Sequence, residues 1–196
     1  MKRLLFLVLS VAMLSLSGCG VRSIPMSRNA VDAAAAEITN QYKRRADLIP
    51  NLVEVVKGYA KHEKTTLESV VSARANATAM TIDPSKATPA ELARYANAQG
   101  QLSQALGRLL AISENYPNLK ADANFRDLQA QLEGSENRIT IARQRYIAAI
   151  NDFNNQIGVF PSSIANSLFF HHSKLPQWDL EASEKKAVEK APEVKF

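Results

Sequence analysis

The sequence of 196 residues contains one cysteine, Cys19, and only seven glycines. A single cysteine excludes an internal disulfide and any metal site that needs several cysteines. Scarce glycine beside abundant alanine favours helices over sheets. The sequence also lacks a P-loop, a dinucleotide fingerprint and a serine triad arrangement, so it offers no catalytic residues. We therefore expect a protein that is not an enzyme and that holds no cofactor other than a covalent lipid.

The excess of basic residues is small. The formal charge is +5, and removal of Lys2 and Arg3 with an N-terminal signal leaves 22 basic against 19 acidic residues, a balance of +3. Proteins that bind nucleic acid concentrate basic residues on one face. The weak bias therefore argues against nucleic acid as a partner.

The histidines do not predict a metal site. His62-Glu63 could begin a zinc-peptidase motif, but that motif needs a histidine at position 66, where the sequence has Thr66. His171 and His172 are adjacent, and adjacent side chains of a helix point to different sides. We interpret them as a polar helix end.

Residues 1–18 combine two positive charges with the apolar run LLFLVLSVAMLSLSG, which is short for a membrane span. This pattern predicts a signal peptide. The end of the segment, Leu16-Ser17-Gly18-Cys19, resembles a bacterial lipobox. The resemblance implies cleavage before Cys19, diacylglycerol on its thiol and a fatty acid such as palmitate on its new amino group. Two alternatives remain, a plain secretory signal followed by a free cysteine and an uncleaved membrane anchor.

The predicted location is the cell envelope, on the extracytoplasmic side of a bacterial membrane. The residue directly after the cysteine is Gly20. An aspartate at this position would be a signal for retention at the inner membrane. By resemblance to enterobacterial sorting, this favours the outer membrane over the inner one.

The remaining chain is predicted to be all-α, an elongated antiparallel bundle of three long helices plus a short fourth helix. Residues 19–27 are expected to form a tether that ends at the N-cap Ser27, and residues 28–172 the bundle. Pro50 lies inside the first helix and predicts a bend, with a break into two helices as the alternative. The expected helices are 28–79, 89–115 (opened by a capping box of Thr88 and Glu91), 121–158 and 162–171.

Apolar or small residues recur at helical spacing on each predicted helix and indicate the buried faces. The fourth helix is expected to bury Ile164, Ala165, Leu168 and Phe169. On the first helix the predicted core positions are Val31, Ala35, Ile38, Tyr42, Ile49, Leu52, Val56, Tyr59 and Val70, with Ala46, Val53, Ala60 and Leu67 beside them.

Residues 173–196 form a charged C-terminal tail by composition. Trp178-Asp179-Leu180-Glu181 and Pro192-Glu193-Val194-Lys195-Phe196 resemble the ending of the family named below. That resemblance suggests a tail docked on the bundle, and a solvated tail is the alternative.

Polar residues accompany the apolar faces of the first and third helices. Antiparallel packing would bring the two sets together, and a buried charge must be paired. We predict an interhelical network that fixes which helix faces which; the alternatives are a ligand pocket or catalytic carboxylate pair, and a surface for a partner protein. The candidate residues are Arg44, Arg45, Asp47, Asn51, Glu136, Asn137, Arg143 and Asn154.

Two stretches resemble the LemA family of bacterial membrane-associated helical proteins. They are RRADLIPNLVEVVKGYAKHE, residues 44–63, and YPNLKADANFRDLQAQLEGSENRITIARQRYIAAINDFNNQIGVFP, residues 116–161. The resemblance implies a helical bundle tethered to a membrane and brings no catalytic residues with it. We expect a scaffold or adaptor for other membrane or envelope proteins. The alternative function is a small-molecule or lipid-binding module with a pocket at the polar residues.

Overall fold

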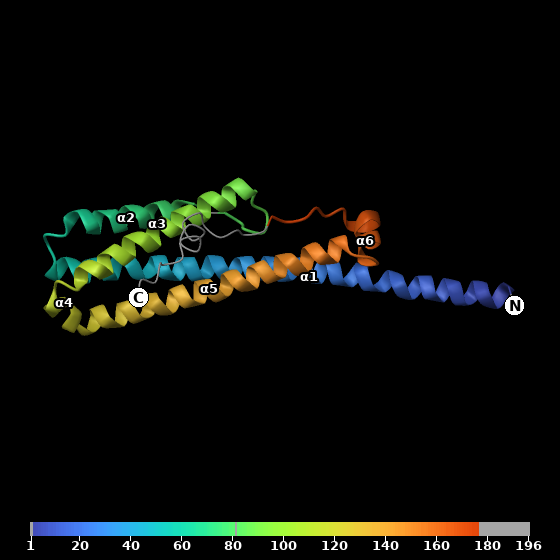
Figure 1. The fold of residues 1–196 in the computed structure, drawn as a ribbon, viewed down its shortest axis with the longest axis horizontal. Helices are drawn as coiled ribbons and strands as arrows, with labels where there is room; N and C mark the ends of the chain where they lie inside the picture. Colours follow the sequence, from blue (N-terminus) through green and yellow to red (C-terminus); the bar gives the residue numbers. More distant parts are fainter. Residues whose placement is uncertain (1, 81, 177–196) are drawn as a thin grey trace, which may run out of the picture. The chain divides into compact units, whose positions relative to one another are not determined.

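The structure is a computed structural model that describes residues 2–80 and 82–176, with side chains from residue 21 onward. Its regular elements are helices α1 (Lys2–Tyr59), α2 (Lys64–Ala79), α3 (Pro89–Ser113), α4 (Pro117–Ala121), α5 (Ala123–Gly158) and α6 (Ser162–Ala165), followed by the π-helix η1 (Asn166–Phe170) (Figure 1). The described residues contain no strand. The predicted all-α class is confirmed.

The chain divides into two units. Unit 1 comprises residues 1–37 and 142–177, and unit 2 comprises residues 38–141 and 178–196. Helices α1 and α5 contribute to both units, while α2, α3 and α4 belong to unit 2 and α6 and η1 to unit 1.

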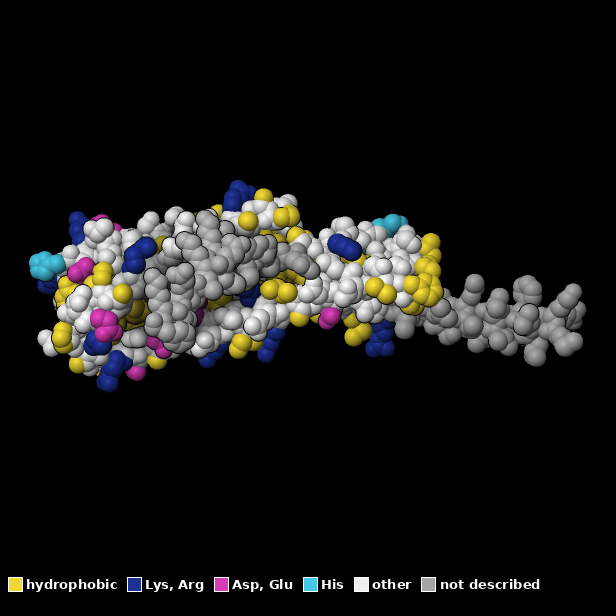
Figure 2. Space-filling model, viewed as in Figure 1, with side chains coloured by type: hydrophobic (Ala, Val, Ile, Leu, Met, Phe, Trp, Pro, Cys, Tyr) yellow, Lys and Arg dark blue, Asp and Glu magenta, His cyan; other side chains and the backbone are white. Residues whose placement is uncertain are grey.

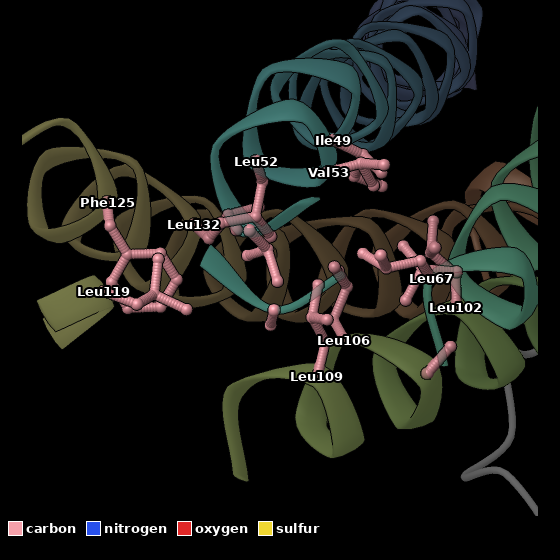
Figure 3. Close-up of a cluster of buried hydrophobic side chains, with 14 of the residues drawn as sticks. Ile49, Leu52, Val53, Leu67, Leu102, Leu106, Leu109, Leu119, Phe125 and Leu132 are labelled. Carbon is pink, nitrogen blue, oxygen red and sulfur yellow. The ribbon is translucent and has the colours of Figure 1, made fainter. Parts of the chain in front are cut away.

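Unit 2 is a bundle built around an apolar core from α1, α2, α3, α4 and α5 (Figure 3). Leu52 of α1, Leu102 and Leu109 of α3 and Leu119 of α4 are all fully buried. The spacing of three and four residues that the sequence shows on each helix therefore marks the faces that meet here. Of the core positions predicted on the first helix, all are buried except Tyr59, which is 45% exposed and donates a hydrogen bond to Asp122.

The first predicted helix, residues 28–79, is in fact two helices. α1 runs through Pro50 without ending, so neither a break at Pro50 nor one uninterrupted helix to residue 79 is correct. The chain instead turns at residues 60–63, where the amide of Glu63 donates to the carbonyl of Ala60 (3.1 Å). Helix α2 returns antiparallel to α1. Its core residues Leu67 and Val70 join the same core as Leu52 and Val56, which explains why the apolar spacing continues across the turn.

Helix α3 begins as predicted. The hydroxyl of Thr88 accepts a hydrogen bond from the amide of Glu91, and the Glu91 carboxylate accepts one from the amide of Thr88. The helix ends at Ser113, two residues before the predicted end. The third predicted helix, 121–158, begins two residues later than expected as α5, and the short helix α4 precedes it. The carboxylate of Asp122 accepts a hydrogen bond from the amide of Phe125 (2.9 Å) and caps α5.

In unit 1, the segment predicted as a tether is helical. Residues 21–27 continue α1 through Pro25, and Ser27 is not an N-cap because its hydroxyl donates to the carbonyl of Ile24 within the helix. Ile24 is fully buried, and the Ser23 hydroxyl donates to the amide oxygen of Gln156 on α5 (3.0 Å). Packing against α5 thus keeps this segment helical.

The fourth predicted helix differs from expectation in the face that it buries. Ala165 is buried, but Ile164, Leu168 and Phe169 are 51%, 64% and 66% exposed. A helical pattern identifies an apolar face without showing that a partner covers it. The part of the tail from residue 177 onward, including both stretches that resemble the family ending, lies outside the described residues, as do the side chains of residues 1–20.

Candidate functional site

The most unusual side chain in unit 2 is Arg45 of α1, which is only 1% exposed. One terminal nitrogen, Nη1, donates to Oε1 of Glu136 on α5 (2.6 Å) and to Oγ of Ser103 on α3 (2.8 Å). The other, Nη2, donates to the side-chain oxygen of Gln99 on α3 (2.6 Å) and to the Gln99 carbonyl (3.3 Å). We call Arg45, Gln99, Ser103 and Glu136 the Arg45 hub.

The hub also reaches the remaining long helix of unit 2. The Gln99 amide nitrogen donates to the carbonyl of Ala77 in the last turn of α2 (3.3 Å). The carbonyls of a last turn have no partner within their own helix, so Gln99 satisfies one of them. One guanidinium group and the glutamine beside it therefore connect α1, α2, α3 and α5.

Burial of a cation without partners would cost several kcal/mol, and the hub offsets this cost in two ways. Glu136 provides an opposite charge, and its side chain is 45% exposed, so only one member of the ion pair loses its hydration. Neutral oxygens and the ring of Tyr42, whose centroid lies 5.2 Å from the Arg45 guanidinium carbon, surround the rest of the cation. The Arg45 Nε makes no hydrogen bond to any group that the structure describes.

The hub borders an aromatic pair. The rings of Tyr42 on α1 and Tyr95 on α3 meet edge to face, with their centroids 5.5 Å apart. Burial raises the pKa of Tyr95 to about 12; the neighbouring Tyr42 adds to this increase and the Arg45 charge opposes it. Tyr95 therefore remains neutral at physiological pH, and the two rings fill the space around the cation.

A second, partly buried polar contact explains how α1 tolerates Pro50. A helix bonds the carbonyl of residue 46 to the amide of residue 50, but proline has no amide hydrogen. Nε of Arg74 on α2 donates to the Ala46 carbonyl instead, at 2.8 Å. The donor that Pro50 lacks thus comes from another helix, and the contact fixes α2 against α1.

The structure places the predicted polar residues in different environments. It brings Arg45 and Glu136 together, whereas Arg44, Asp47, Asn51 and Asn137 are exposed. Arg44, Asp47 and Asn51 therefore do not line an internal site in unit 2. Their spacing places them at the edge of the apolar face of α1. At such an edge the sequence alone does not determine whether a side chain points inward.

Arg143 and Asn154 belong to unit 1, where both are half-buried on α5. Asn154 makes two hydrogen bonds with the backbone of Leu175: its amide nitrogen donates to the carbonyl (3.0 Å) and its oxygen accepts from the amide (2.8 Å). This pair fixes the chain that follows η1 against α5.

The sequence prediction omitted the two hub residues of α3, Gln99 and Ser103. One signal was present, because Gln99 occupies a core position among leucines and is 4% exposed. A long polar side chain at such a position indicates a buried polar partner on a facing helix. Ser103 is too short and too common in helices to give a comparable signal.

The chemistry of the hub favours structure over catalysis. An arginine stays protonated in proteins and cannot exchange protons with a substrate near neutral pH. The Glu136 carboxylate already accepts a hydrogen bond from the Arg45 guanidinium. Among the described residues, no group of His, Cys, Asp or Glu side chains could hold a metal ion. In the same part of the chain, no helix is both long enough and apolar enough to cross a membrane.

Comparison with known proteins identifies the relatives of this bundle. The model of the LemA family matches residues 34–196, which include the hub, all of unit 2 and the part of unit 1 from residue 34 onward. The chain belongs to the LemA family. It is 24% identical over 189 residues to Protein LemA of Metamycoplasma hominis, a match that covers 92% of this chain and 83% of that protein.

The other relatives of this LemA family member are similar over a shorter stretch. Magnetosome proteins MamQ 1 and MamQ 2 of Paramagnetospirillum magneticum are each 34% identical to it over 64 residues, which is 33% of this chain and 24% of theirs. The family match begins at residue 34, so Cys19 and the residues around it stand outside the matched region. Family membership therefore supports the bundle and leaves the N-terminal segment to be assessed from its own residues.

Proposed function

We propose that this LemA family member is a lipid-anchored envelope protein that acts as a non-enzymatic scaffold or adaptor for other membrane or envelope proteins. The lipid is diacylglycerol on Cys19, with a further acyl chain on its amino group after cleavage behind Gly18. Several acyl chains together give a durable anchor, whereas one gives only marginal membrane binding. The location is the extracytoplasmic side of the membrane, with the outer membrane favoured.

The observation that carries this proposal is the short distance between the proposed anchor and the folded bundle. Position 19 falls within α1, and Ile24, only five residues later, is already fully buried against the rest of unit 1. At 1.5 Å per residue this separation is about 8 Å. The lipid would therefore hold unit 1 at the membrane surface, as suits a protein that presents a surface to neighbours in the same membrane.

The exposed polar residues of α1 in unit 2 are the surface that we assign to a protein partner. Arg44, Asp47 and Asn51 are spaced by three and four residues, so they share one edge of the helix, and all three are exposed. Mixed charge along an exposed helix edge suits a polar interface with defined orientation.

The anchor is tested by the intact mass of the protein extracted from membranes. We expect a chain that begins at Cys19 and carries diacylglycerol and a fatty acid, and we expect the Cys19→Ala variant to lack both. A full-length chain of unmodified mass, or wild-type protein recovered from the soluble fraction, would contradict the proposal.

The adaptor role is tested by cross-linking in intact cells and identification of the captured proteins. Reversal of charge at two positions, Arg44→Glu with Asp47→Arg, should reduce capture of the main partner about tenfold and leaves the net charge unchanged. Arg126→Glu with Asp127→Arg on α5, where both residues are exposed, also leaves the net charge unchanged; it is the matched control and should capture the partner as wild type does. Equal capture by all three proteins would exclude this surface, and absence of a reproducible partner would exclude the role.

A further inference from the structure

The end of unit 1 exposes an unusual set of large apolar side chains. They lie on a short stretch from the end of α5 through α6 and η1, and we call them the tip patch: Val159 (59% exposed), Phe160 (66%), Ile164 (51%), Leu168 (64%) and Phe169 (66%). Figure 2 shows hydrophobic side chains gathered at the end of the described surface that α6 and η1 form. A cluster of this kind on a soluble surface marks a place that another apolar phase covers.

The exposure of the tip patch is built into the fold. The Ser162 hydroxyl donates to the carbonyl of Gln156 (2.6 Å), and Ser162 and Ala165 form the buried side of α6. The side chain of Asn166, the first residue of η1, donates to the carbonyl of His172 and accepts from its amide, each at 3.0 Å. The double hydrogen bond between Asn154 and Leu175 holds the next residues. These contacts fix the backbone so that the apolar side chains point away from the unit.

The patch lies level with the N-terminal part of α1 within unit 1. Ser23 of α1 is hydrogen-bonded to Gln156 of α5, and the two helices run antiparallel. The residues after Gln156 therefore continue in the direction of position 19. Phe160 follows Gln156 by four residues, just as Ser23 follows Cys19 by four. The tip patch and the proposed lipid attachment site thus share one end of unit 1.

The charges at this end suit a membrane with anionic lipids. Residues 20–31 contain Arg22 and Arg28, and residues 153–176 contain Lys174, two histidines and no acidic residue. Arg28 is paired with Asp32 (3.3 Å), so Arg22 and Lys174 supply the basic charge beside the patch. A basic surface around exposed apolar side chains is the combination that binds the interface of an anionic bilayer.

We propose that the tip patch inserts into the lipid bilayer as a second membrane contact, beside the lipid on Cys19. The proposal rests on the proposed anchor for the orientation of unit 1, but the contact itself is made by the apolar side chains of α6 and η1. Two contacts from one end of the unit would stop it from pivoting about a single lipid attachment.

The test measures contact with acyl chains by tryptophan fluorescence. The full-length protein, with Trp178→Phe to remove the native tryptophan, is reconstituted into vesicles of phosphatidylethanolamine and phosphatidylglycerol, with or without brominated acyl chains. The reporter is Ile164→Trp, and the matched control is Val71→Trp on α2, because Ile164 and Val71 are 51% and 52% exposed. We expect brominated lipid to reduce the emission at position 164 about twofold and to leave the emission at position 71 unchanged.

A second pair of variants separates the patch from mere proximity to the anchor. Replacement of Phe160, Leu168 and Phe169 by serine, in the Ile164→Trp protein, should abolish most of the quenching. Ile141→Ser, at a position 48% exposed in unit 2, should preserve it. Quenching that survives the triple replacement would overturn the proposal, because the anchor alone would then bring the reporter to the lipid.

The outcomes distinguish the tip contact from the anchor. Protein that stays with the membrane but shows equal, weak quenching at positions 164 and 71 would overturn the tip contact and leave the anchor intact. A blue-shifted emission at position 164 without quenching would place the patch against protein and would also overturn it. Protein released from the membrane would overturn the anchor. Brominated vesicles would then be added to that soluble protein. Quenching of the emission at position 164 would support the tip contact, and its absence would overturn the tip contact.

Discussion

The two units depart from the usual distribution of side chains in opposite ways. Unit 2 buries a charged residue, Arg45, at 1% exposure, whereas unit 1 exposes two phenylalanines, Phe160 and Phe169, at 66% each. In unit 2 the departure is compensated inside the chain, because the cation donates four hydrogen bonds, one of which is an ion pair with Glu136. In unit 1 no described residue covers the two rings to a comparable degree. The difference separates a feature that holds the fold together from one that faces a partner outside it.

The largest expected effect compares two phenylalanines of unit 1. Phe153 is fully buried beneath the Arg28 side chain, and Phe153→Ala should destabilise the protein by about 4 kcal/mol because it leaves a cavity in the core. Phe169→Ala should change the free energy of unfolding by less than about 0.5 kcal/mol. Chemical denaturation of both variants measures the contrast. A similar loss in both would mean that the exposed ring supports the fold.

The second comparison uses neighbouring arginines of unit 2. Arg45→Met should cost about 3 kcal/mol, because Gln99, Ser103 and Glu136 lose their common donor. Arg44→Met, one residue earlier on the exposed side of α1, should cost less than about 0.5 kcal/mol. Thermal unfolding followed by circular dichroism tests this pair. If the Arg45→Met protein has the same melting temperature as wild type, the hub does not stabilise the bundle.

The third prediction concerns the contact between Arg74 and the Ala46 carbonyl. Arg74→Met should cost about 1 to 2 kcal/mol because the partly buried Ala46 carbonyl loses the hydrogen bond from Nε. In a Pro50→Ala background the cost should be much smaller, since the new amide at position 50 bonds the same carbonyl within α1. A double-mutant cycle measures this coupling, and additive effects would show that Pro50 and Arg74 act independently.

A smaller and stabilising effect is expected at Gly134 of α5. A methyl group at this position would meet no atom within 4 Å, so the glycine does not serve close approach of another helix. Gly134→Ala should therefore stabilise unit 2 by about 1 kcal/mol by reducing the entropy of the unfolded chain. Gly107→Ala on α3, also in open space, should behave alike, and a destabilised Gly134→Ala protein would reveal a contact at that site.

The last effect appears only in alkaline solution. The folded state raises the pKa of Tyr95 from 10 to about 12, so between these values the unfolded chain loses this proton while the folded chain keeps it. The stabilisation from the neutral ring is complete below pH 10 and is lost as the pH rises toward 12. Tyr95→Phe should reduce the fall in stability across this range. An unchanged slope in denaturation curves would mean that Tyr95 titrates normally in the fold.

The sequence predicted the buried faces well and the chain reversals less well. Leu52, Val56 and Val70 follow helical spacing because each faces the same core, and that shared core concealed the turn at residues 60–63. No proline or glycine marks the turn itself. Pro50 suggested a bend or a break, but the interaction that keeps α1 continuous comes from Arg74, which is 24 residues away.

The candidate site was predictable in part. A buried arginine and a carboxylate on the facing helix follow from the need to pair charges, and Arg45 and Glu136 are such a pair. Which of two adjacent arginines points inward depends on the rotation of α1 by a fraction of a turn, which apolar spacing alone does not determine. For the same reason Ile164 and Leu168 could be assigned to one face of a helix but not to a covered one.

The hydrogen bond from Arg74 to Ala46 has an evolutionary consequence. Proline at position 50 leaves the Ala46 carbonyl without a donor from its own helix, and arginine at position 74 supplies that donor. A lineage that loses the proline therefore no longer needs the arginine. A lineage that loses the arginine first leaves the carbonyl without this hydrogen bond. In related sequences positions 50 and 74 should therefore change together. Proline should be lost at position 50 before arginine is lost at position 74.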